Sequence, residues 1–224
     1  MGIVYIIATP IGNLEDLSPR AARILREATL VVSEDKRVTG KLISHLGLRK
    51  AMITFHEYSD QRELVKIIDE LESGGSVAIV TDAGTPGISD PGAFLVSEIL
   101  RRLPETKIFA IPGPSALAAA ISVAGLRAEP FIFFGFPPEK KGRQSFFRSL
   151  TNRVETLVFL ESPHRIVKTL EELLASLGGD RRAFVGRELT KLHETHYRGA
   201  LGDVTEAVKK GTLRGEYVII IAAK

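Results

Sequence analysis

The chain has 224 residues, of which 44% are hydrophobic and 25% are charged, a composition typical of a globular protein with well-developed cores. Its 30 basic residues only slightly outnumber its 27 acidic ones, so a polyanionic partner is permitted but not required. The absence of cysteine excludes disulfides and thiolate metal sites and favours a cytoplasmic enzyme. No apolar run approaches the roughly 20 residues of a membrane span, and no signal peptide is expected at the N-terminus.

Strands and helices alternate along the first half of the chain. Ser18 and Pro19 mark the start of one helix, and Asp60 with Glu63 predicts a capping box for another. Because right-handed crossovers join alternating strands and helices, we expect a mostly parallel, doubly wound α/β sheet. Apolar, β-branched runs predict its strands at residues 3–8, 30–33, 51–54, 76–80 and 107–111.

The chain changes character at residues 112–114, where Pro-Gly-Pro breaks a strand. We therefore predict an N-terminal α/β domain at residues 1–112 and a C-terminal α/β domain at residues 113–224. The second half repeats the pattern of strand, polar corner and helix, and its helices are expected to be capped by Ser162 and Asp203. Its strands are predicted at residues 131–136 and 156–161, before Arg187, and at the C-terminal end.

Five polar or glycine-rich corners follow predicted strands. In the corner after residue 81, Gly84 and Gly87 can adopt positive φ and bring backbone close to a ligand, whereas Asp90 is placed to cap the next helix. One such corner alone is equally consistent with a tight turn, but together they predict a cleft lined by backbone amides and carboxylates. The five corners are ATPIGN, SEDKR, DAGTPGISDPG, PGPSA and ESPHR.

Several familiar chemistries are disfavoured. The chain contains no G-x-G-x-x-G, G-K-[ST] or G-x-S-x-G motif, which argues against Rossmann-type hydride transfer, nucleotide hydrolysis and an α/β-hydrolase. His193 and His196 flank Glu194, but they lack the spacing of a zinc-binding helix, so no metal is expected.

The densest group of cations follows the predicted strand at residues 131–136. Such a run commonly keeps a loop solvated, yet Phe146 and Phe147 lie beside it, and cations next to aromatic rings also suit RNA. The group comprises Lys140, Lys141, Arg143, Arg148 and Arg153.

The ordered motifs ATPIGNLEDLS, SEDKR, TDAGTPGISDPG, PGPSAL, ESPHR and GRELTKLHE resemble those of the RsmI family, the ribosomal RNA small-subunit methyltransferases within the tetrapyrrole methylase superfamily. The resemblance runs through essentially the whole chain. It implies two α/β domains with S-adenosylmethionine in the cleft between them, usually in a homodimer. The implied reaction is 2′-O-methylation of a cytidine ribose in small-subunit rRNA. This chain departs from the family at Lys36, where threonine is common.

The resemblance also implies roles for individual residues. We favour Asp35 and Glu34 as acceptors of the hydroxyl proton, because they follow a strand beside the first two corners, over Asp90, His56 and His164. Predicted RNA contacts are Arg37, Lys140, Lys141, Arg143 and Arg165. Predicted cofactor contacts are Pro10, Ile11, Ala83, Gly84, Thr85, Pro86, Ile88, Ser115, Ala116, Glu161, Glu188, Leu189 and Glu216.

Two alternatives remain open from the sequence. One is a methyltransferase acting on a tetrapyrrole ring, against which the basic loop argues, because a flat macrocycle requires a large apolar mouth. The other is a cofactor-binding or RNA-binding module without catalysis.

Overall fold

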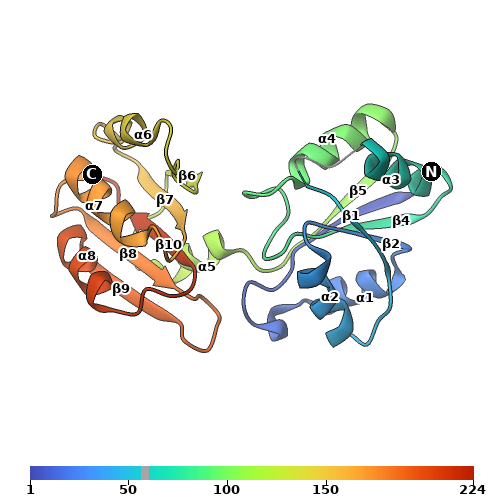
Figure 1. Cartoon of the computed structure of the whole chain (residues 1–224), viewed down its shortest axis with the longest axis horizontal. Coiled ribbons are helices and arrows are strands. Elements are labelled where there is room, and N and C mark those ends of the chain that lie inside the picture. The colour runs from blue at the N-terminus through green and yellow to red at the C-terminus, as the bar shows by residue number, and fades with distance from the viewer. Residues whose placement is uncertain (57–60) are drawn as a thin grey trace. The chain divides into compact units, whose positions relative to one another are not determined.

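The computed structural model describes residues 1–56 and 61–224 (Figure 1). The chain divides into two compact units, Met1–Ser115 and Ala116–Lys224. The division falls after Ser115, whereas the boundary predicted from the sequence falls after Pro112.

The first unit is built on a parallel sheet with the strand order β3-β2-β4-β1-β5. Its strands are β1 (Ile3–Ile7), β2 (Leu30–Ser33), β3 (Ala51–Thr54), β4 (Ser76–Ile79) and β5 (Lys107–Ile111). The described helices are η1 (Leu14–Asp16), α1 (Pro19–Glu27), α2 (Lys36–His45), α3 (Gln61–Glu72) and α4 (Gly92–Arg102). The predicted parallel α/β architecture is confirmed for this unit.

Helices cover both faces of this sheet (Figure 1). Along β4, Val77 and Ile79 pack in one apolar cluster with α3 and α4, while Ala78 and the following Val80 pack in a second cluster with α1 and α2. Because successive strand residues point to opposite faces, a continuous apolar run is what such a doubly covered strand requires.

The helix starts of the first unit agree with the sequence in part. Ser18 caps α1 by accepting a hydrogen bond from the Ala21 amide at 3.0 Å, and Pro19 is its first residue. Helix α4 begins at Gly92 with Pro91 at its N-cap, so it starts one residue later than the sequence predicted. The predicted cap Asp60 lies outside the described residues.

The second unit has a mixed sheet with the strand order β6-β7-β10-β8-β9. Its first pair is parallel, and the other three pairs are antiparallel, so this sheet is not the mostly parallel one expected. The strands are β6 (Phe131–Gly135), β7 (Thr156–Glu161), β8 (Arg182–Arg187), β9 (Thr195–Ala200) and β10 (Tyr217–Ile221). The described helices are α5 (Ala116–Ala124), α6 (Arg143–Ser149), α7 (Ile166–Leu177) and α8 (Leu201–Lys210).

One face of the second sheet packs against α6, α7 and α8 in a single apolar cluster. Alternate residues Val158, Phe184 and Ile220 are buried outside that cluster, on the face where α5 contacts β8 and β10. Both sheets are therefore covered on both faces, which gives two α/β units with separate cores.

Two predicted caps in the second unit are wrong. Helix α7 begins at Ile166 with Arg165 at its N-cap, because the carbonyl of Ser162, and not its hydroxyl, accepts the first amides. Asp203 lies in the first turn of α8, after the N-cap Ala200. In the described part of the chain, no helix is long and apolar enough to cross a membrane.

Candidate functional site

Three corners of the first unit are joined by hydrogen bonds at the carboxyl edge of its sheet. Thr9, after β1, exchanges two backbone hydrogen bonds with Gly84, after β4, at 2.9 and 3.0 Å. The Thr9 hydroxyl donates to the Thr81 carbonyl at 3.2 Å, and the Thr85 hydroxyl donates to the Pro114 carbonyl, beyond β5, at 3.0 Å. The corners that the sequence placed at one edge are thus held together as one fixed set of loops.

Gly84 is required by the geometry of these loops. Its φ is +86°, and a Cβ built on it would lie 3.4 Å from the Cγ2 of Ile11 and 3.7 Å from the Pro114 carbonyl oxygen. Ile11 is itself buried. A Cβ at position 84 would touch Ile11 at an ordinary contact distance, so the cost of a side chain there comes from the strained backbone conformation.

Replacing Gly84 by alanine is expected to lower the free energy of unfolding by about 1 kcal/mol, because an L residue disfavours this φ. Urea denaturation measures the change. The matched control is Gly40→Ala within α2, where a Cβ meets nothing within 4 Å, and that change is expected to leave stability equal or higher. Equal stability of Gly84→Ala and the unmodified chain would contradict this explanation.

Asp90 closes the loop that follows Gly84. Its carboxylate accepts hydrogen bonds from the amides of Gly87 at 2.8 Å and Gly92 at 2.7 Å. These bonds give Asp90 a structural role, in line with the sequence-based preference against it as the proton acceptor. Ala83 and Ile88 are exposed in the same loop, whereas Pro86 is buried.

The side chain of Asp35 is held by contacts with Arg37 at the start of α2. Its carboxylate accepts a hydrogen bond from the Arg37 amide at 2.8 Å and forms an ion pair with the Arg37 guanidinium at 2.7 Å. These hydrogen bonds from Arg37 lower the pKa of Asp35 to about 2. Such a carboxylate is a weak proton acceptor at neutral pH, so the geometry favours a structural role for Asp35. The Arg37 side chain is 89% exposed.

Glu34 and Asp82 form a pair of carboxylates beside Asp35. The Thr81 hydroxyl donates to Glu34 Oε2 at 2.9 Å, and the Asp35 amide donates to Asp82 Oδ1 at 3.1 Å. Burial, followed by the charge of Glu34, raises the pKa of Asp82. Asp82 was missed as a candidate, although its place in the corner that follows a strand was the signal that could have found it.

A pocket of about 740 Å³ lies beside Glu34. It is lined by Glu34 and His56 together with Asp90 and the start of α4. Three of the residues considered as proton acceptors therefore line one pocket, whereas His164 lies on the second unit. Among the described residues, no group of three or more acidic or histidine side chains is arranged to hold a metal ion.

Glu161 is buried at the end of β7, with 1% of its surface exposed. Its carboxylate accepts hydrogen bonds from the Thr169 hydroxyl at 2.6 Å and the Ser162 amide at 2.7 Å. It also forms an ion pair with Arg165 at 2.9 Å. Both oxygens are thus engaged within the second unit. Arg165, a predicted RNA contact, also donates to the Pro137 carbonyl at 3.2 Å.

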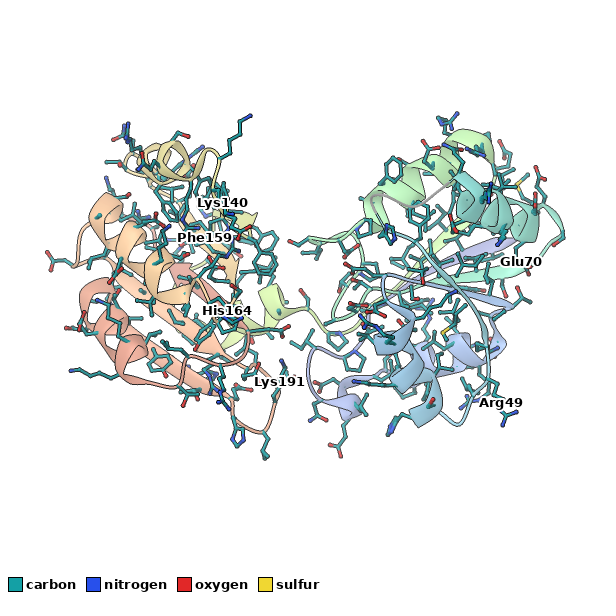
Figure 2. The ribbon with its side chains drawn as sticks, in the orientation of Figure 1. Arg49, Glu70, Lys140, Phe159, His164 and Lys191 are labelled. Atoms are coloured by element: carbon teal, nitrogen blue, oxygen red, sulfur yellow. The ribbon has the colours of Figure 1, made fainter. Side chains whose placement is uncertain are left out.

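Arg143 was predicted to contact RNA, and this prediction is wrong because its side chain is buried, with 4% exposed. The guanidinium donates to Glu172 at 2.7 Å, to the Pro138 carbonyl at 2.8 Å and to the Thr169 hydroxyl at 2.8 Å. It also lies 5.0 Å from the centre of the Phe147 ring. By contrast, Lys140 and Lys141 in the same loop are exposed, and Figure 2 shows where Lys140 lies.

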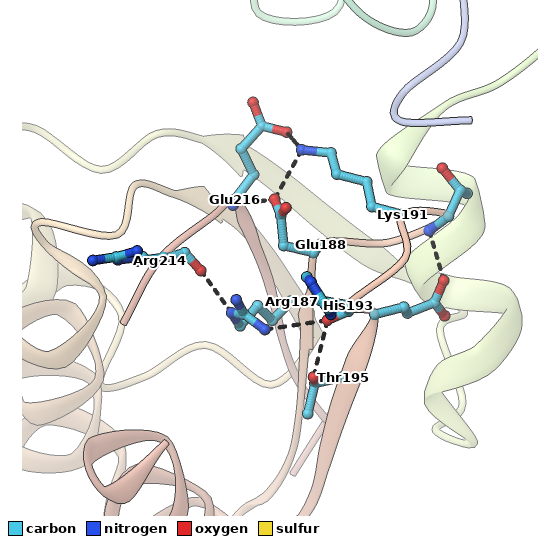
Figure 3. Close-up of polar contacts among 9 residues, drawn as sticks. Arg187, Glu188, Lys191, His193, Thr195, Arg214 and Glu216 are labelled. Atoms are coloured by element: carbon cyan, nitrogen blue, oxygen red, sulfur yellow. Dashed lines mark hydrogen bonds and ion pairs between the residues drawn. The ribbon is translucent and has the colours of Figure 1, made fainter. Parts of the chain in front are cut away.

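Lys191 joins two predicted cofactor residues, as Figure 3 shows. Its ammonium group lies 2.8 Å from a carboxylate oxygen of Glu188 and 2.9 Å from one of Glu216. Burial opposes ionisation of Glu188, but the hydrogen bonds from Lys191 and the Glu216 amide, together with the charges of Lys191 and Arg187, outweigh it and lower the pKa of Glu188. The Glu216 amide also donates to Glu188 at 2.9 Å. Sequence reasoning missed Lys191, because the two carboxylates that it bridges lie next to strands β8 and β10, which are far apart in the chain.

Arg187 holds the loop that carries Lys191 in place through hydrogen bonds (Figure 3). The Arg187 guanidinium donates to the carbonyls of Arg214 at 2.6 Å and His193 at 3.1 Å. Glu188 has a φ of +53° at the start of this loop, and the adjacent Leu189 is buried. The predicted second-unit candidates Glu188, Leu189 and Glu216 are therefore brought together at one end of the sheet.

Comparison with known families identifies the class of protein. Residues 3–205 match the family of Tetrapyrrole (Corrin/Porphyrin) Methylases. Among solved structures, uroporphyrin-III C-methyltransferase from Thermus thermophilus has a TM-score of 0.69 at 21% identity, covering 99% of this chain and 94% of that one. A cobalt precorrin-4 methyltransferase has a TM-score of 0.67 at 17% identity, covering 98% and 94%. These two structures share the fold.

Curated relatives narrow the class. Ribosomal RNA small subunit methyltransferase I of Thermotoga maritima is 41% identical over 224 residues, which is 100% of both chains. The protein of the same name from Synechocystis sp. is 40% identical over 223 residues, covering 99% of this chain and 79% of that protein. The chain therefore belongs to the tetrapyrrole methylase family and, within it, to the ribosomal RNA small subunit methyltransferase I group. The resemblance seen in the sequence motifs is confirmed.

Proposed function

We propose that the protein transfers a methyl group from S-adenosylmethionine to the ribose 2′-hydroxyl of a cytidine in small-subunit ribosomal RNA. The observation that carries the proposal is the 41% identity to a small-subunit rRNA methyltransferase along the entire length of both chains. S-adenosylmethionine is the methyl donor of this family. A related uroporphyrin-III C-methyltransferase is complexed with S-adenosyl homocysteine, the compound that remains when this donor has given up its methyl group.

The loops of the first unit suit such a donor. Exposed Ala83 and Ile88 flank the fixed turn at Gly84, where the missing side chain leaves a cradle beside Ile11. Apolar Ile11 and Ile88 would hold the adenine and ribose, and loop amides would hydrogen-bond polar ends of the molecule. The remaining proposed contacts are Pro10, Thr85, Pro86, Ser115, Ala116, Glu188, Leu189 and Glu216. Glu161 is left out because its side chain is buried and both of its carboxylate oxygens are engaged within the second unit.

S-adenosylmethionine supplies a methyl group already activated by its sulfonium charge. The protein must therefore hold the acceptor oxygen in line with that methyl group, a contribution worth several kcal/mol. It must also remove the proton of a poorly acidic hydroxyl. We assign the second task to Glu34, assisted by Asp82. The Thr81 hydroxyl occupies Oε2 of Glu34, so Oε1 is the oxygen assigned to accept the proton.

From the proposed rRNA substrate we also infer that the protein is located in the cytoplasm. The exposed side chains of Arg37, Lys140 and Lys141 would contact phosphates of the RNA. We also propose a homodimer, which light scattering of the purified protein tests. A mass equal to one 24.5 kDa chain at micromolar concentration would contradict the dimer.

The function is tested by incubating the protein with methyl-labelled S-adenosylmethionine and unmodified 30S subunits. We expect label on the ribose of one cytidine, located by mass mapping of the RNA. Label on a base contradicts ribose transfer, and label on a free tetrapyrrole selects the alternative reaction. Binding of the donor without any transfer would identify a non-catalytic module.

A further inference from the structure

We infer that the second unit contains a phosphate-binding pocket for the RNA backbone, between helices α6 and α7. This inference rests on the proposed function, and it adds Lys168 of α7 to Lys140 and Arg148 of the basic run and places all three in one pocket. The pocket measures about 600 Å³. Its cationic lining comes from three elements: Lys140 in the loop before α6, Arg148 on α6 and Lys168 on α7.

The charge balance of the pocket is positive. Four cations and two carboxylates line it, but Arg143 and Glu172 neutralise each other in an ion pair. Lys140, Arg148 and Lys168 then face only Glu139. All three side chains are exposed, and within residues 1–56 and 61–224 none of them forms an ion pair, so their charges are free to attract an anion.

The pocket is also held in a fixed shape. Arg143 and Arg165 donate to the carbonyls of Pro138 and Pro137, which fastens the loop carrying Lys140 to α7 and β7. Behind it, Phe147 of α6 is buried in the core of the unit. Because buried groups fix the walls, binding an anion to the three cations requires little further ordering of the backbone.

The chemistry of the lining indicates which part of RNA it recognises. Lysine is a point-like phosphate binder and arginine presents a planar fork of donors. Among the described residues that line the pocket, none has an aromatic side chain on which a base could stack. The expected ligand is therefore a backbone phosphate, whatever the base attached to it. Such a contact positions the RNA and does not select the nucleotide.

The test uses the charge reversals Lys168→Glu and Arg148→Glu in the full chain. Each is expected to weaken binding to unmodified 30S subunits about tenfold at 0.1 M salt. The slope of log K against log salt should fall by about 0.7 to 0.9 for each phosphate that the variant no longer neutralises. The control is Lys210→Glu, which makes the same charge change at an exposed position at the end of α8 and should change binding little.

Donor affinity and the unfolding midpoint are measured alongside, and both should be unchanged for these surface positions. Lys168→Gln provides a second variant with a smaller charge change and should weaken binding less. If the unmodified protein methylates 30S subunits while both reversals bind them as the Lys210→Glu control does, the pocket assignment is overturned and the proposed function stands. If the protein methylates no RNA but the reversals still weaken its binding to 30S subunits, the proposed reaction fails and the phosphate pocket stands.

Discussion

Replacing Glu34 by glutamine is expected to slow methyl transfer to 30S subunits by about 10²- to 10⁴-fold, the range contributed by a positioned general base. Glutamine keeps the shape of the side chain and can still accept the hydrogen bond from Thr81, but it cannot accept the hydroxyl proton. Single-turnover kinetics at saturating donor measure the chemical step. Donor affinity, measured by calorimetry, should be unchanged.

The matched control is Asp35→Asn at the neighbouring position. Asparagine is as good a helix N-cap as aspartate, so α2 should be retained and the rate should change much less than in Glu34→Gln. A full rate in Glu34→Gln combined with a large reduction in Asp35→Asn would return the role of base to Asp35.

The variant Asp82→Asn can be tested by its thermal stability as well as by its rate of methyl transfer. Burial and Glu34 raise the pKa of Asp82 in the folded protein above its ordinary 3.8, so ionisation opposes folding once the pH exceeds 3.8. The variant should slow transfer and yet unfold at a higher temperature than the unmodified protein at pH 7. This stability difference should vanish below pH 3.8, where the carboxyl is protonated in both the folded and unfolded states. Thermal unfolding from pH 3 to pH 7 measures it, and a lower midpoint at pH 7 would contradict the explanation.

The strands of the first unit could be predicted because each is a continuous apolar run bounded by turn residues, and the alternation with helices indicated their parallel direction. In the second unit, direction could not be predicted, since an apolar run has the same pattern whichever way its neighbour points. The loop between β8 and β9 has no glycine or proline, and its turn is made by Glu188 and Thr190 at positive φ. The antiparallel return of the chain therefore left no signal in the sequence.

The candidate site could be predicted at the level of loops and less well at the level of side chains. Corners after parallel strands must share one edge of the sheet, so the contacts among the loops at Thr9, Gly84 and Pro114 followed from the fold. The burial of Arg143 depended on Thr169 and Glu172, which are 26 and 29 residues further along the chain. In the sequence, the same arginine belongs to a solvated basic run.

Arg143→Ala is expected to lower the free energy of unfolding of the second unit by about 3 kcal/mol, the lower end of the cost of breaking a buried ion pair. The substitution leaves Glu172, Thr169 and the Pro138 carbonyl without the donors they have now. Arg143→Lys should recover little, because an ammonium group cannot reproduce the three separate directions of the guanidinium fork. Urea denaturation measures both variants, with exposed Arg148→Ala as the control that should change stability by less than about 0.5 kcal/mol.

The same substitution separates an indirect role in RNA binding from a direct one. Because Arg143 fastens the loop that carries Lys140 and is itself 4% exposed, its removal should weaken binding to 30S subunits by loosening the pocket between α6 and α7. Binding and stability should therefore fall together in Arg143→Ala, whereas Lys168→Glu should reduce binding alone. A stable Arg143→Ala protein with weakened RNA affinity would mean that the guanidinium leaves its buried partners to contact phosphate directly. An unstable protein with full affinity at low temperature would mean that the loop keeps its shape without Arg143.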